Sequence, residues 1–194
     1  MGMNHREDTF KRLRQNPKSL SDLSEIADYR LNLTSSLGVM PYPEVPLELH
    51  AHYGNYEIQA AFGKDSFSTS GQRGVGVLHF PERKSYALLV TLVKSERDFS
   101  PSTMYRDYAI NRELFHWESQ SRTTQSSTPG QNLIHHGHRG YSVHLFVRKT
   151  ENIGKSTAPF QYLGKVSHVE HKGECPISFV WKLDYPMPGE LLEE

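Results

Sequence analysis

The sequence predicts an α+β fold: a mainly antiparallel, barrel-like β-sheet with short helices and an N-terminal α-hairpin. From Gly74 onward the spacing of apolar residues changes from 3.6 residues to two, which is the period of a half-buried strand. At least five such segments follow one another without a strand–helix–strand repeat, which favours antiparallel pairing. Fourteen glycines and eleven prolines supply the many turns that such a sheet needs.

The N-terminal region, residues 1–37, is expected to form a helical hairpin and linker ahead of a domain at residues 47–192. The first helix is expected to end at Pro17. Ser19 and Asp22 have the spacing of a capping box, which predicts that a second helix begins there. The order of elements is therefore a helical segment followed by a β-rich domain.

Within the domain, Asn55 is expected to cap a short helix that Gly63 ends. Thr128 is expected to cap a second one, with Pro129 as its first residue. A hairpin with the turn PERK precedes a strand over residues 86–93, which is apolar on both faces and should be central and buried. Further strands are predicted at 115–120, 141–149 and 177–184, with an extended segment over 158–173 that is broken at Gly164.

Composition and charge narrow the class of protein. The formal net charge is zero, but residues 94–149 hold eight Lys and Arg against five acids, so that region is locally basic. A single cysteine, Cys175, excludes an intramolecular disulfide. No stretch approaches the 18 apolar residues of a membrane span, and the N-terminus lacks the apolar core of a signal peptide. We expect a soluble, cytoplasmic protein that makes no membrane contact.

The richest stretch is Lys94–Arg122, in which aromatic rings alternate with arginines, amides and hydroxyls. Rings beside hydrogen-bonding groups are what a pocket for a flat polar ligand such as a nucleic-acid base requires. An aromatic core edge with a solvated rim has the same composition, so both interpretations stay open. Strand alternation places His116 and Trp117 on opposite faces, which means that one of the two is structural.

A base taken out of the stack needs rings around it, donors and acceptors along its edge, and cations for the flanking phosphates. The candidate base-binding residues are Tyr105, Asp107, Tyr108, His116, Trp117, Ser119 and Gln120. The candidate phosphate-binding residues are Lys94, Arg106, Arg122 and Arg148.

Other chemistries have weaker support in the sequence. The histidines at 135, 136 and 138 lack a cysteine or acidic partner at ligand spacing, so a solvated or phosphate-facing loop is expected there instead of a metal site. Glu82 and Lys84 match a nuclease triplet but fall in a predicted turn. The glycines of GQRGVG lead into a hairpin and not into a helix. We therefore expect no enzyme activity, no metal and no cofactor.

Two long signatures, YRDY and FHWESQ, stand among further segments such as STPGQNLIHHG and VHLFVRK. Together, from about residue 47 to residue 192, they resemble a domain, formerly of unknown function, at the C-terminus of superfamily II helicase proteins that begin with a phospholipase-D-type nuclease domain. Members of that group include type IV, modification-dependent restriction enzymes. The chain departs from the full-length pattern because it has no Walker loop, helicase motif or nuclease motif.

The resemblance implies a target-recognition domain that binds double-stranded DNA carrying a modified cytosine, 5-methyl or 5-hydroxymethyl, by base flipping into an aromatic pocket. The ATPase and nuclease would then be other domains of the same or an associated protein. Two alternatives remain open: a reader of phosphorothioate DNA backbone, and a protein-interaction or regulatory module of a helicase-nuclease.

Overall fold

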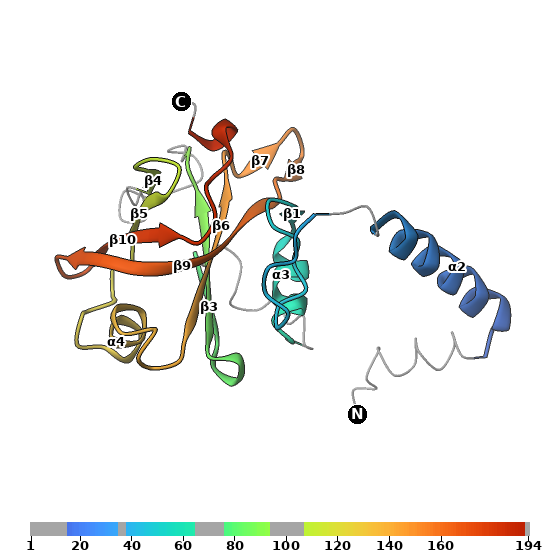
Figure 1. Ribbon diagram of the computed structural model, residues 1–194, viewed down its shortest axis with the longest axis horizontal. Coiled ribbons are helices and arrows are strands. Elements are labelled where there is room, and N and C mark those ends of the chain that lie inside the picture. Colours follow the sequence, from blue (N-terminus) through green and yellow to red (C-terminus); the bar gives the residue numbers. More distant parts are fainter. Residues whose placement is uncertain (1–14, 35–37, 65–75, 94–106, 193–194) are drawn as a thin grey trace. The chain divides into compact units, whose positions relative to one another are not determined.

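The computed structural model describes residues 15–34, 38–64, 76–93 and 107–192 (Figure 1). The chain divides into two compact units, Met1–Val39 and Met40–Glu194.

In the described part of the first unit, helix α2 spans Pro17–Thr34. Pro17 lies in the first turn of this helix, where its missing N–H costs nothing, and the helix that it was expected to end lies outside the described residues. The Asn16 side-chain oxygen accepts a hydrogen bond from the Ser19 N–H at 3.3 Å, so Asn16 caps the helix and the predicted capping box at Ser19 is wrong. The other arm of the expected hairpin lies outside the described residues.

The second unit is built on one eight-stranded sheet with the order β2-β3-β6-β9-β10-β5-β4, and β1 pairs with β9 beside this path. All the pairs are antiparallel except β3 with β6, and the connection between those two contains β4, β5 and α4. The strands are β1 His52–Tyr53, β2 Val77–Phe80, β3 Ser85–Thr91, β4 Tyr108–Ala109, β5 Leu114–Glu118, β6 Ser142–Arg148, β9 Phe160–Lys172 and β10 Ser178–Leu183. Apart from this sheet lies a small hairpin of β7 Asn152–Ile153 and β8 Ser156–Thr157. The α+β class is therefore confirmed.

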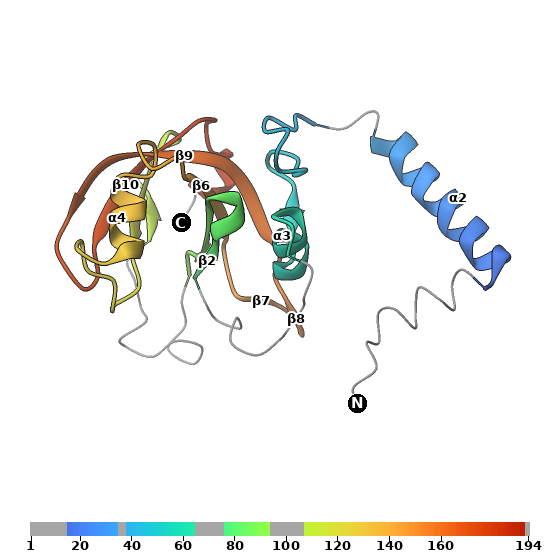
Figure 2. The ribbon, with the colours of Figure 1, turned by 90° about the horizontal axis from the view of Figure 1, so that it is seen from below.

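The sheet curves strongly around β9, but it does not close into the expected barrel (Figure 2). Closure would require the two end strands, β2 and β4, to pair with each other. These strands have only four and two residues, and each pairs on one side alone among the described residues. Such short strands offer few backbone groups for a closing ladder.

Strand β9 runs unbroken through Gly164, where a break was expected. Gly164 has φ +89, and a Cβ there would lie 3.2 Å from the Tyr42 hydroxyl and 3.3 Å from Leu49 Cδ1. Only glycine fits both this backbone angle and this close approach. The glycine therefore shapes the strand without ending it.

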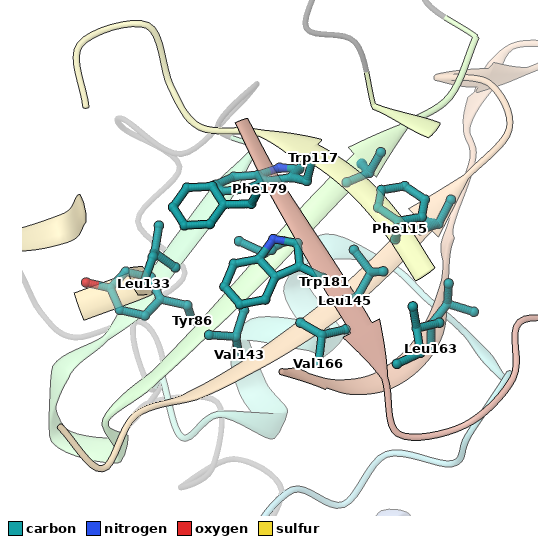
Figure 3. Packing of buried hydrophobic residues seen from close by; sticks show 14 of the residues in the cluster. Tyr86, Phe115, Trp117, Leu133, Val143, Leu145, Leu163, Val166, Phe179 and Trp181 are labelled. Atoms are coloured by element: carbon teal, nitrogen blue, oxygen red, sulfur yellow. The ribbon is translucent and has the colours of Figure 1, made fainter. Parts of the chain in front are cut away.

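The two faces of the sheet bury separate hydrophobic clusters. One face packs against α4, Thr128–Ile134, around Trp117, Phe179 and Trp181 (Figure 3). The other packs against α3, Asn55–Ala61, through Ile58 and Phe62 of the helical segment. Strand β3 is buried along its whole length, as expected of an apolar strand with a neighbour on each side.

The starts of α3 and α4 and the hairpin turn lie close to their predicted positions. Helix α3 is capped at Gly54, whose N–H donates to Glu57, and α4 is capped at Ser127, whose hydroxyl accepts from the Gly130 N–H. Each cap lies one residue before the predicted one, Asn55 or Thr128. The PERK turn contains the 3₁₀ helix η1, Pro81–Arg83, and a second one, η3, spans Gly189–Leu191.

No helix among the described residues is long and apolar enough to cross a membrane.

Candidate functional site

Strand β5 divides the ring-rich stretch between the two faces of the sheet. Trp117 points into the core, is 3% exposed, and has its ring centroid 5.5 Å from that of Phe179 and 6.4 Å from that of Trp181 (Figure 3). His116 points to the opposite face, as strand alternation requires. The predicted stacking role of Trp117 therefore has no geometric support, because its ring is enclosed by other core residues.

Tyr108, which is exposed, and His116, which is half-buried, form an aromatic pair on this opposite face, which we call the outer face. They are direct partners in the antiparallel β4–β5 ladder. Their ring centroids lie 4.7 Å apart with an angle of 15° between the planes, and Tyr108 is 50% exposed. Side chains directly opposite each other on one face of a ladder are close enough to stack in this way. The sequence predicted both residues for the site, and the structure brings them together.

A groove of about 140 Å³ lies beside this pair on the outer face. Three neighbouring strands supply one row across it, since Val180 of β10 pairs with His116 of β5 on one side and with Glu170 of β9 on the other. The lining also includes Tyr108, Ile110, Lys172 and Ser178. Its outer-face side chains thus combine two rings, two aliphatic side chains, a carboxylate, an ammonium and a hydroxyl, and the inward-facing residues His171 and Phe179 complete the lining.

These groups can contact and hydrogen-bond a ligand. The rings and aliphatic side chains can contact a flat ligand, Glu170 can accept from an amino group, and Lys172 can attract an anion. Among the described residues, no group of three or more His, Cys, Asp or Glu side chains could hold a metal ion.

Asp107 and Ser119, two further predicted residues, hold the backbone of this region in place. The Asp107 carboxylate accepts from the Glu118 N–H at 2.9 Å and so fastens the segment before β4 to the end of β5. Ser119 is 1% exposed, and its hydroxyl accepts from the Ile177 N–H at 2.9 Å. Neither residue is part of the groove lining. Their position supports a structural role more than contact with a base.

The remaining predicted residues are not gathered at the groove. Gln120 is exposed just after β5, and Arg122 is exposed in the turn that follows. Arg148 is engaged within the fold: it donates to Thr91 at 2.9 Å and to the Ala158 carbonyl at 3.1 Å, and its guanidinium carbon lies 4.3 Å from the centre of the Phe160 ring. Tyr105, Lys94 and Arg106 lie outside the described residues.

Glu170, Lys172, Ile110 and Val180 are groove residues that the sequence did not identify. Alternation along β9 and β10 could have shown which of them share a face. Their position beside His116 depends on the register of three strands. That register cannot be predicted from the sequence, because the strands are far apart along the chain.

A second polar cluster, which resembles a catalytic pair, is buried against the other face of the sheet. His144 is fully buried, its Nδ1 lies 2.7 Å from the Tyr162 hydroxyl, and its Nε2 lies 3.2 Å from the Ser142 hydroxyl. Burial lowers the pKa of His144 to about 3, so the imidazole is neutral at physiological pH. With no access for a substrate, this cluster satisfies buried polar groups and stabilises the fold.

Comparison with known proteins assigns most of the second unit to one family. Residues 47–194 match the family model described as "Domain of unknown function (DUF3427)". No curated protein matches the chain. Because the model spans the whole sheet and the groove, the chain belongs to the DUF3427 domain family.

Proposed function

We propose that residues 47–194 form a DNA-binding target-recognition domain of a modification-dependent restriction system and that they read modified cytosine, 5-methyl or 5-hydroxymethyl. The observation that carries this proposal is the groove beside the stacked Tyr108–His116 pair. An accessible aromatic ring bordered by hydrogen-bonding groups fits a flat, polar, heteroaromatic ligand.

In this proposal a cytosine flipped out of the duplex contacts the Tyr108–His116 pair. Glu170 accepts a hydrogen bond from the exocyclic amino group, and Lys172 attracts a neighbouring phosphate. A group on C5 of the base contacts the aliphatic side chains of Ile110 and Val180. This mechanism retains Tyr108 and His116 from the sequence analysis and replaces Trp117 with the residues of β9 and β10.

The expected discrimination is modest. Burying one methyl group contributes about 0.8 kcal/mol, which corresponds to a preference of roughly fourfold. A larger preference requires close fit around the modified position. Strand cleavage and ATP hydrolysis are assigned to other domains of the same or an associated protein.

The test is equilibrium binding of the full chain to matched duplexes at one stated salt concentration. One duplex is unmodified, and the others carry 5-methylcytosine, 5-hydroxymethylcytosine or a phosphorothioate linkage at the same position. We expect the two cytosine modifications to bind more tightly than the unmodified duplex. Equal binding of all four duplexes would contradict recognition of a modification, and a preference for the phosphorothioate alone would assign the domain to backbone recognition.

A protein-binding role is the second candidate, and one observation favours it. Tyr108 and Ile110 are 50% and 45% exposed beside the groove, and exposed apolar side chains of this kind also suit a peptide partner. The same assay separates the two roles, since a protein-interaction module binds none of the duplexes.

A further inference from the structure

A β-bulge in β9 places two histidines on the same face of the sheet. In the β9–β10 ladder, Val180 pairs with Glu170 and Trp181 pairs with His168, which leaves Val169 as an extra residue. Residues 168 and 171 are an odd number apart, so a regular strand would direct them to opposite faces. The bulge instead directs both toward the inner, core-facing side of the sheet, which is a known use of bulges next to functional sites.

On the inner face the two imidazoles contact each other and the core rings below them. His168 Nε2 lies 3.0 Å from His171 Nδ1, and the ring centroids are 5.0 Å apart. The His168 ring also packs edge-on against Phe179 and Trp181. One of the two facing nitrogens donates and the other accepts, so one hydrogen is shared between them.

His136, from the loop after α4, completes what we call the histidine cluster: His136, His168 and His171. Its Nδ1 lies 3.2 Å from the Tyr141 carbonyl oxygen, which can only accept, so Nδ1 carries the hydrogen. Its Nε2 accepts from the His168 backbone N–H at 3.1 Å. Both nitrogens of neutral His136 are therefore in use, and a second proton on the ring would face an N–H donor.

The titratable groups that face His168 are His171 on its own strand and His135 and His136 on the loop. Burial lowers the pKa of His136 and of His168, and for His168 the neighbouring histidines lower it further. The stability that neutral His136 and His168 contribute is fully present above about pH 6.5 and is lost as the pH falls toward and through their lowered folded-state pKa values.

Residues of the bulged segment of β9 also line the groove. Glu170 and Lys172 lie on its outer side, and His171 lines the groove as well as belonging to the cluster. A displacement of residues 168–171 on the inner side therefore moves Glu170 on the outer side.

We propose that the histidine cluster is a pH-sensitive latch: in its neutral form it fastens the bulged segment of β9 to the loop after α4, and its protonation releases that segment and weakens recognition in the groove. Protonation of His136 is the releasing event, because it removes the acceptor for the His168 N–H. The coupling to ligand binding rests on the proposed function, whereas the latch itself does not.

The latch is tested by NMR on the full chain, by following the His168 backbone amide and the three imidazoles from about pH 8 to about pH 5. We expect the His168 amide resonance to shift as His136 protonates, with a midpoint below about 6.5. A His168 amide that does not respond while His136 titrates at its ordinary value would overturn the latch. This titration needs no variant, so it stands even if substitutions in the cluster unfold the protein.

The coupling is tested by binding of the unmodified and 5-methylcytosine duplexes at about pH 7.5 and about pH 5.5. Acidification alone adds positive charge and strengthens binding to any duplex, so the quantity to compare is the ratio of the two affinities. We expect the preference for the modified duplex to disappear at the lower pH. His136→Gln, whose amide oxygen still accepts but does not titrate, should preserve the preference, whereas the control His138→Gln, in the same loop, should lose it like the unsubstituted chain.

The outcomes separate the two proposals. If the His168 amide titrates as expected but no duplex binds at either pH, the proposed function fails and the latch is upheld. If the duplexes bind with a preference that is the same at both pH values, the coupling is overturned.

Discussion

The aromatic residues on the two faces of the β5–β10–β9 region differ in their burial: those on the inner face lie in the core, and those on the outer face lie at the surface. On the inner face, Trp117, Phe179 and Trp181 are at most 3% exposed and pack together in the core. On the outer face, Tyr108 and His116 stack at the edge of a groove that also holds a carboxylate and an ammonium. Neighbouring residues of one strand thus serve stability and recognition respectively. The alternation of the strand, more than its ring content, separates the two roles.

The largest effect is expected from Trp117→Ala. Removing a buried indole from this cluster should lower the free energy of unfolding by about 3–5 kcal/mol, as large-to-small core substitutions do. Chemical denaturation measures the change. His116→Ala, one residue away on the outer face, is the matched control and should cost no more than about 1.5 kcal/mol. A similar loss for both variants would remove the distinction between the faces.

Acidification should reveal a contribution to stability from His144, which is buried in the cluster on the other face of the sheet from Trp117. His144 has its pKa lowered to about 3 by burial, so the unfolded chain takes up a proton before the folded protein does. The stability due to neutral His144 is complete above about pH 6.5 and is lost progressively as the pH falls toward and through the folded-state value. NMR of the imidazole should find His144 neutral at about pH 5, whereas a titration midpoint near 6.5 would contradict its enclosure.

Tyr108→Ala should weaken binding to modified DNA with little effect on stability. Loss of stacking on a base costs about 1–3 kcal/mol, or roughly 5- to 150-fold in affinity. The matched control is Tyr56→Ala on α3, because Tyr56 is 49% exposed and Tyr108 is 50% exposed. Fluorescence anisotropy with a 5-methylcytosine duplex measures the change, and equal losses for the two variants would exclude a specific role for Tyr108.

The smallest effect is expected from Lys172→Gln. A phosphate contact carries no sequence information, so this change should weaken the modified and unmodified duplexes alike and lower the slope of log affinity against log salt by about one. Lys155→Gln, in the exposed turn between β7 and β8, is the control. A change in the preference between duplexes would instead assign Lys172 to reading the base.

Local patterns in the sequence predicted much of the fold. Period-two alternation located the hairpin around the PERK turn and the strands β5, β6 and β10, because each depends on its own residues and their burial. The α3 and α4 caps were one residue late because Gly54 and Ser127, not Asn55 and Thr128, have the extended backbone of a cap. The predictions of a closed barrel and of a strand break at Gly164 were wrong, since both features depend on contacts between distant segments.

Of the nine residues that line the groove, the sequence predicted two, Tyr108 and His116. The alternation of β5 showed that His116 and Trp117 must separate, but only the packing of Trp117 on Phe179 shows which of the two is buried. Glu170 and Lys172 were missed because they reach the groove through the β9–β10–β5 register. The bulge at Val169, which sets that register, has no local signature in the sequence.

The central claim is that the groove beside Tyr108 and His116 reads a modified cytosine. Its most direct test is the ratio of affinities for the 5-methylcytosine and unmodified duplexes, measured at one salt concentration for the unsubstituted chain and for Tyr108→Ala. We predict a ratio of roughly fourfold or more for the unsubstituted chain, as burial of one methyl group requires, and a ratio near one for the variant. A ratio of one for the unsubstituted chain, or an unchanged ratio in Tyr108→Ala, would contradict the claim.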